Sequence, residues 1–136
     1  MNNSNRQLWG PTLLRSVIGI VFLMHGGQKL FVWGFHGVAS FFGHIGVPLP
    51  AFFAVVVTLV EFIGGAALVL GLCTRWVALP LMIDMLVAIL TVKLKGGFFA
   101  PQGFEYELTL MIASLSLAIM AGGRASLDSL IRGQRV

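Results

Sequence analysis

Charged residues are scarce in this chain of 136 residues, because Asp, Glu, Lys and Arg together make up only 10% of it. Soluble domains carry about 25%. Hydrophobic residues account for 57% and the mean hydropathy is +0.94, so a water-soluble globule would lack polar side chains for its surface. The composition argues against a soluble enzyme, a secreted disulfide-rich scaffold and a disordered region, and it favours a protein of the lipid bilayer.

Motifs for several kinds of chemistry are also missing. Cys73 is the single cysteine, which rules out an internal disulfide, a CxxC redox pair and a cysteine-rich zinc site. No HExxH spacing, phosphate-binding glycine loop or Ser/His/Asp arrangement can be assembled. Nine basic residues give a net charge of +4, but they are scattered among apolar runs and form no patch for nucleic acid.

Four long apolar segments are present, and prolines and glycines fall near their boundaries. They cover residues 11–31, 51–72, 76–94 and 104–121. A membrane-spanning helix needs about 20 mostly apolar residues, so each segment is long enough, or nearly so, to cross a bilayer. The sequence therefore predicts an all-α membrane protein in which residues 1–136 form a single domain, a bundle of four transmembrane helices.

The link over residues 32–50 predicts a further, shorter helix. Val38, Phe41, Phe42 and Ile45 recur at the spacing of an amphipathic helix. Aromatic side chains such as those in this link are typical of the headgroup zone of a membrane. We therefore expect a short interfacial helix that lies on, or dips into, the outer membrane surface.

Basic residues predict how the chain is oriented. The side that carries both termini and the second link holds six arginines, whereas the other side holds three lysines. The six are Arg6, Arg15, Arg75, Arg124, Arg132 and Arg135. Because basic residues accumulate in the cytoplasm, both termini are expected there, in the inner (plasma) membrane of a bacterium.

Each apolar segment also carries ionisable groups, which are costly at membrane depth and usually face one another inside a bundle. Helical spacing places small or polar residues on one stripe of each segment. The stripes are Arg15, Gly19, Phe22, Gly26 and Lys29; Thr58, Glu61, Gly65 and Leu68; Asp84, Ala88 and Thr91; and Glu105, Thr109, Ile112, Ser116 and Met120. If they converge, the interior contains a polar network or ligand pocket made of Arg15, His25, Lys29, Glu61, Asp84 and Glu105.

Three interpretations of this network remain open. It could be structural, because polar side chains hold transmembrane helices in register. It could be a pocket, open toward the outer face, that handles a proton, a quinone or a small polar molecule. A metal site that uses His25, His36 and His44 is a third option, although no metal-binding spacing supports it. Glycine-rich helix faces would also permit a homo-oligomer.

Several consecutive phrases resemble the DoxX family of small four-helix bacterial membrane proteins. They are RSVIGIVFLMHGGQK at 15–29, GFHGVASFFGHIGVPLP at 34–50, EFIGGAALVLGLCTR at 61–75, and a tail over 97–130 that includes GFEYELTL and GGRASLDSL. The resemblance covers the chain from about residue 13 to residue 131. Its most specific part is the phrase that begins at Glu61 and ends at Arg75.

The resemblance implies a link to redox chemistry. The family is named after a subunit of a quinone-reducing thiosulfate oxidation system, and other members are described as oxidoreductases or as membrane partners of sulfur-transfer and superoxide-detoxifying proteins. The resemblance also marks six residues as positions of the family pattern, without assigning them catalytic roles. They are Arg15, His25, Lys29, Glu61, Arg75 and Glu105. With no cofactor motif of its own, the chain is expected to use a bound quinone or partner redox proteins.

The resulting hypothesis is a membrane component of a redox or stress-detoxification system that binds quinone near Glu61 and His25. Two alternatives come from other classes. One is a carrier of a small molecule, coupled to protons, that uses the same network. The other is a membrane scaffold that recruits soluble redox enzymes through arginine-rich termini.

Overall fold

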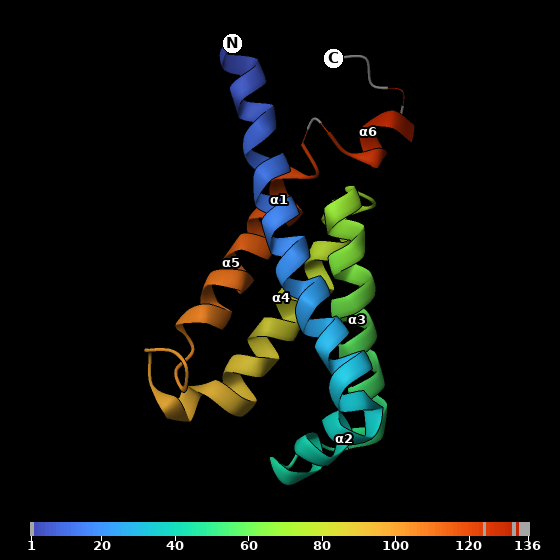
Figure 1. The fold of residues 1–136 in the computed structure, drawn as a ribbon. Helices are drawn as coiled ribbons and strands as arrows, with labels where there is room; N and C mark the ends of the chain where they lie inside the picture. Colours follow the sequence, from blue (N-terminus) through green and yellow to red (C-terminus); the bar gives the residue numbers. More distant parts are fainter. Residues whose placement is uncertain (1, 124, 132, 134–136) are drawn as a thin grey trace.

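The computed structural model describes residues 2–123, 125–131 and 133, and within them every regular element is helical (Figure 1). The α-helices are α1 (Asn3–Gly27), α2 (Gly34–His44), α3 (Pro50–Leu70), α4 (Thr74–Ala88), α5 (Glu105–Met120) and α6 (Leu127–Ile131). Two π-helical segments, η1 (Gln28–Trp33) and η2 (Ile89–Lys93), continue α1 and α4, and the 3-10 turn η3 (Leu94–Gly96) follows η2. The all-α prediction is confirmed.

Three helical runs in the described residues are long and apolar enough to cross a membrane: Asn3–His44, Pro50–Leu70 and Thr74–Gly96. The predicted fourth crossing is α5, which has 16 residues. This is shorter than the roughly 20 residues that a full crossing needs, so the fourth crossing stays a prediction. A short helix is present in the predicted link as α2, which turns away from α1 at Gly34, where φ is +70°. Its position at the membrane surface stays a prediction.

Helix ends differ from the predicted boundaries, and two N-terminal ends are instructive. The first helix begins at Asn3 rather than near residue 11, because the side chain of Asn2 accepts a hydrogen bond from the Asn3 N–H and caps the helix. Apolar length alone does not detect a helix that continues beyond the membrane. Thr74, predicted to lie in a link, is already the first residue of α4.

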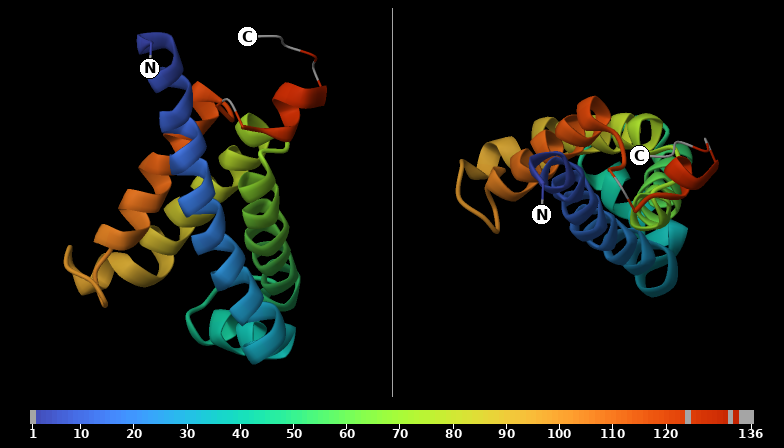
Figure 2. Two further views of the ribbon diagram at one scale, coloured as in Figure 1. Left: turned by 45° about the horizontal axis from the view of Figure 1, so that its top comes forward. Right: turned by 90° about the horizontal axis from the view of Figure 1, so that it is seen from above.

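Two helix pairs form the body of the molecule: α1 packs along α3, and α4 packs along α5. The pairs lie close together near the termini and diverge toward α2 (Figures 1 and 2). Glycines bring α1 and α3 together, because a Cβ atom at Gly19 or Gly65 would meet the backbone of the facing helix. The predicted inner stripes of these two helices are confirmed: Arg15, Gly19, Phe22 and Gly26, and Thr58, Glu61, Gly65 and Leu68, are buried.

The predicted inner stripe of α5 is wrong. Ile112 and Met120 of that stripe are both 48% exposed. The buried residues of α5 are instead Glu107, Leu110, Ser114, Leu117 and Ala118. The prediction relied on the polarity of Thr109 and Ser116, but their hydroxyls donate to carbonyls of the same helix, those of Glu105 at 2.8 Å and Ile112 at 2.9 Å. A hydroxyl that is satisfied in this way needs no partner in the interior.

The end of the molecule near the termini is held by two side chains. Arg15 is 2% exposed, and its guanidinium donates to backbone carbonyls in α3 and in the segment after α5. Asp128 in α6 accepts the N–H groups of Cys73 at 2.8 Å and Thr74 at 3.1 Å. Asp128 thus caps the N-terminus of α4 from outside that helix, and it fixes α6 against the turn between α3 and α4.

Candidate functional site

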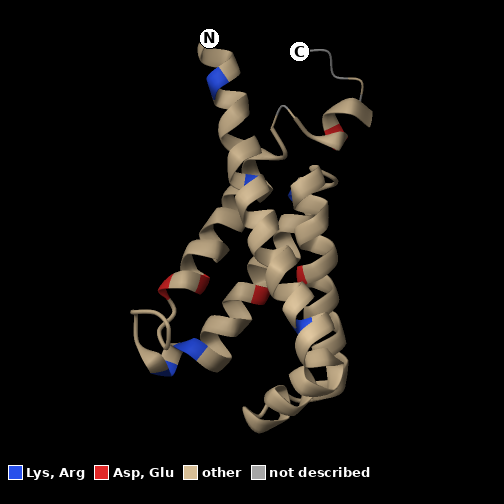
Figure 3. Cartoon of the chain, viewed as in Figure 1, with Lys and Arg blue, Asp and Glu red and all other residues tan. Residues whose placement is uncertain are grey.

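A cavity of about 700 Å³ lies where the two helix pairs diverge. Every helix except α6 contributes to its wall, and α2 lies across its end with Val38, Phe41 and Phe42. Most lining side chains are apolar, and the charged ones come from α3, α4, α5, η1 and η2. Figure 3 shows that the acidic positions of α3 and α4 lie near the middle of the bundle, away from both ends.

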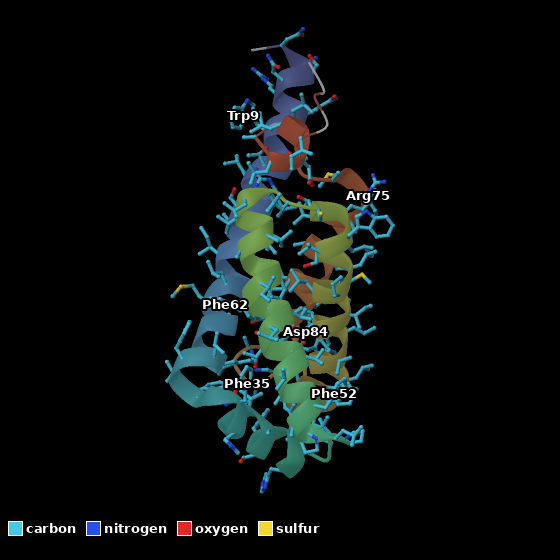
Figure 4. All side chains as sticks on the ribbon, turned by 90° about the vertical axis from the view of Figure 1, so that its right-hand side faces the viewer. Trp9, Phe35, Phe52, Phe62, Arg75 and Asp84 are labelled. Carbon is cyan, nitrogen blue, oxygen red and sulfur yellow. The ribbon has the colours of Figure 1, made fainter. Side chains whose placement is uncertain are left out.

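Three of the predicted site residues meet in this cavity. The Nζ atom of Lys29 lies 2.6 Å from Oε2 of Glu61, and their side chains are only 17% and 4% exposed. Asp84 belongs to α4 and lies on the side that faces α3 (Figure 4), with its carboxyl group near that of Glu61. Two neighbouring carboxyl groups can form a hydrogen bond only when one of them carries a proton. The Oδ2 atom of Asp84 is buried and has no partner within the described residues.

A second ion pair, which the predicted network did not include, faces the same cavity. Nζ of Lys93 lies 3.5 Å from Oε1 of buried Glu107 and also donates to the carbonyl of Pro101 at 2.7 Å. The other carboxylate oxygen of Glu107 is buried without a partner among the described residues. The sequence signal was available: Glu107 shares its helix face with Leu110 and Ser114, both of which are buried.

Both cavity lysines sit in π-helical segments, Lys29 in η1 and Lys93 in η2. A π-helical turn shifts the side chains that follow it around the helix axis, and such turns are frequent at functional sites. Each helix pair therefore brings one Lys–Glu ion pair to the cavity: Lys29–Glu61 from α1 and α3, and Lys93–Glu107 from α4 and α5.

His25 takes part through a different contact. Its Nε2 atom lies 3.1 Å from the hydroxyl of Tyr106, which sequence reasoning did not single out, and both residues line the cavity. The pair joins α1 to α5. His25 is exposed on its outer side, so it belongs to the rim of the cavity rather than to the buried carboxyl cluster.

The structure places the other predicted residues outside the cavity. Arg15 donates to the carbonyls of Leu68, Val69, Gly122 and Ala125, at the end of the molecule that carries the termini. Glu105 accepts the N–H of Ala100 at 2.9 Å and so stabilises the loop before α5. Arg75 donates to the carbonyl of Ile119 at 3.4 Å. Arg124, Arg132 and Arg135 lie outside the described residues.

Within the described part of the chain, no three His, Cys, Asp or Glu side chains come together as a metal site would require. His36 and His44 lie at opposite ends of α2 and are both exposed. The cavity is therefore an apolar chamber whose wall contains charged side chains, and two of their carboxylate oxygens have no hydrogen-bond partner within the described residues. Small-molecule sites in proteins are typically apolar pockets with a few polar groups in their walls.

Apolar helices, a buried set of ionisable groups and a chamber between two helix pairs define a small helical membrane protein. The sequence profile of the DoxX family matches residues 10–94, and the chain belongs to that family. No solved structure matches it.

Three relatives agree with this assignment. The chain is 38% identical to "Putative oxidoreductase CatD" of Bacillus subtilis, over 90% of this chain and 87% of that protein. It is 36% identical to "Uncharacterized membrane protein Rv3486" of Mycobacterium tuberculosis, over 85% of this chain and 77% of that protein. An "Uncharacterized protein" of Haemophilus influenzae is 31% identical over 81% of this chain and 80% of its own length.

Proposed function

We propose that the protein is the membrane component of a redox or stress-detoxification system and that its cavity binds a quinone. The observation that carries the proposal is the position of Lys29, Glu61 and Asp84 in the wall of an otherwise apolar chamber. A quinone has the matching chemistry, since its ring and tail are apolar and its two oxygens form hydrogen bonds. The relative named an oxidoreductase supports a redox role.

The chamber suits such a ligand in size and in its polar atoms. Its volume of about 700 Å³ falls within the range of small-molecule sites, about 300–1,000 Å³. Lys29 can donate to a carbonyl oxygen, and the unpartnered oxygens of Asp84 and Glu107 can accept from the hydroxyls of the reduced form. Trp33, Phe41 and Phe42 supply flat apolar walls.

Reduction of a quinone to a quinol takes up two electrons and two protons. The electrons come from a reduced redox protein that docks on the membrane domain. The protons pass through the carboxyl pair of Glu61 and Asp84, which gives up one proton for each electron and takes up another from the aqueous side before the next transfer. These two groups are suited to this task because they lie near each other in the wall of the chamber. Lys29 holds the Glu61 carboxylate in place between turnovers.

Asp84→Asn is expected to weaken quinol binding by at least about tenfold, because it removes a carboxylate that can accept a charge-assisted hydrogen bond from a quinol hydroxyl. Glu61→Gln is expected to weaken it as well, because it releases Lys29 from its place in the chamber wall. The measurement is the dissociation constant of decylubiquinol for the purified protein in lipid nanodiscs. Glu105→Gln is the matched control: it makes the same change on a carboxyl group outside the chamber, and binding should stay within twofold of the wild type. Unchanged binding in both chamber variants would contradict the proposal.

A second candidate, a carrier of small molecules coupled to protons, is favoured by the neighbouring carboxyl groups of Glu61 and Asp84 in the chamber wall. It predicts proton movement into liposomes that depends on an added solute and is lost in Asp84→Asn, with no quinone bound.

The scaffold alternative depends on residues 127–136, of which 132 and 134–136 lie outside the described part of the chain. It predicts capture of a redox enzyme that survives Glu61→Gln but not removal of this segment.

We also propose that the protein lies in the bacterial inner membrane with both termini in the cytoplasm. The start of α1, the turn between α3 and α4, and α6 lie at one end of the molecule, opposite α2 (Figure 1). Arg6, Arg15 and Arg75 belong to this end, and basic residues favour the cytoplasm.

Cys73 reports this orientation directly, because it is exposed at the turn between α3 and α4. A membrane-impermeant maleimide is expected to leave Cys73 unlabelled in intact cells and to label it once the membrane is opened. The matched control is Cys73→Ser/Lys95→Cys, with the thiol at the opposite end, which should react in intact cells. The reverse pattern would require the opposite orientation.

A further inference from the structure

Helices α1 and α5 belong to different pairs, and a contact between two side chains joins them at the wall of the cavity. This contact is the hydrogen bond of 3.1 Å between Nε2 of His25 and the hydroxyl of Tyr106. The two rings lie 5.9 Å apart, centre to centre, at an angle of 45°. The two helices diverge toward α2 (Figure 1), and the bond lies in the wall of the cavity between the pairs.

His25 and Tyr106 each have one side in the cavity and one side on the surface. Both line the 700 Å³ chamber, and Tyr106 is 40% exposed. His25 also lines a second hollow, which Met24, Gln28 and Val32 form on the outer face of α1 together with Phe62 of α3. His25 therefore borders both the interior chamber and the outer surface of α1.

The surface around this point is the kind that faces acyl chains. Met24 is 68% exposed and Val32 is 73% exposed, as expected for side chains in contact with lipid. Water is scarce at this depth, so an imidazole and a phenol there need hydrogen-bond partners within the protein. Their mutual hydrogen bond meets that need while the gap is closed.

We infer that the gap between α1 and α5 is a lateral entrance from the bilayer, closed by the His25–Tyr106 hydrogen bond. The inference rests on the proposed function for its ligand, an amphiphile with a polar ring and a long apolar tail. Such a molecule dissolves in the membrane. It can enter the chamber from the bilayer with its polar ring leading, and it does not need to pass through water. Opening costs one neutral hydrogen bond, which corresponds to about 2- to 10-fold in a rate.

Tyr106→Phe tests the entrance, because it removes the hydroxyl and keeps the ring. The association and dissociation rates of decylubiquinone, measured by stopped flow in nanodiscs, should both rise about 2- to 10-fold, and the dissociation constant should change less than twofold. Thr109→Val is the control on the same helix, since that hydroxyl bonds only to its own helix in the described structure, and it should leave both rates unchanged.

A second measurement does not depend on quinone binding. In the Cys73→Ser background, Ala88→Cys places a thiol in the chamber wall, where a membrane-soluble maleimide can react with it. Adding Tyr106→Phe should accelerate this labelling about 2- to 10-fold. If labelling accelerates while no quinone binds, the result supports the entrance and contradicts the proposed quinone binding.

Two results would overturn the entrance. One is unchanged rates in both measurements. The other is faster dissociation alone with a weaker dissociation constant, which would make Tyr106 a binding contact of the quinone rather than part of a gate.

Discussion

Replacing Arg15 by methionine is expected to lower the free energy of unfolding by about 4 kcal/mol or more. The guanidinium is 2% exposed and donates to the carbonyls of Leu68, Val69, Gly122 and Ala125. A buried polar group that loses its partner costs about 1–3 kcal/mol, and here several carbonyls lose theirs together. Because proteins are stable by only about 5–15 kcal/mol, this loss is expected to prevent most of the protein molecules from folding.

The measurement is the unfolding midpoint in mixed micelles at increasing denaturing detergent, together with the yield of monodisperse protein. Arg75→Met is the control, because Arg75 is exposed and makes one long hydrogen bond, to Ile119, so its loss should cost little. Arg15→Lys should fall between the two, since an ammonium keeps the charge but cannot reach carbonyls on two segments in the same fork geometry. Equal stability of Arg15→Met and Arg75→Met would contradict the expectation.

Gly26→Ala is expected to separate α1 from α3 and to destabilise the protein by about 1–3 kcal/mol or more, although it adds one methyl group. A Cβ atom at this position would overlap the backbone of Phe62 and Glu61, and backbone atoms cannot move aside as the end of a side chain can. The change would also displace Glu61, so loss of the Lys29–Glu61 ion pair and of ligand binding should accompany the loss of stability.

The neighbouring Gly27 provides a matched control. A Cβ atom there would lie 3.8 Å from the ring of Phe62, an ordinary contact, so Gly27→Ala should be neutral or stabilising by up to about 1 kcal/mol through helix propensity. Thermal unfolding followed by size-exclusion chromatography compares the two variants. A smaller effect at Gly26 than at Gly27 would mean that the two helices do not pack as closely as described.

The sequence was sufficient for the helices and for part of the site. Apolar length located the four segments that became α1, α3, α4 and α5, and helical spacing located α2. The small and polar stripes of α1 and α3 identified Lys29 and Glu61 as neighbours, because glycine on both facing helices leaves little freedom in their register. The depth of Asp84 in the third segment predicted that it belongs to the same polar network.

The remaining features depend on contacts that side-chain chemistry does not specify. Arg15 was expected to pair with acids, but its partners are backbone carbonyls, which every residue has. Hydropathy cannot distinguish a π-helical turn from an α-helical one, so the sequence did not predict how Lys93 would meet Glu107. The choice of Glu105 over Glu107 relied on polar residues of α5 whose hydroxyls are satisfied within the helix.

The division of the ion pairs between the two halves has a consequence for biosynthesis. A cation or an anion that enters the bilayer alone is costly, whereas a paired one costs less. Lys29 pairs with Glu61 inside the first half of the chain, and Lys93 pairs with Glu107 inside the second half. Each half can therefore leave the translocation machinery with these charges already paired. Asp84 has its carboxyl neighbour in the other half, so its environment is complete only after the halves assemble.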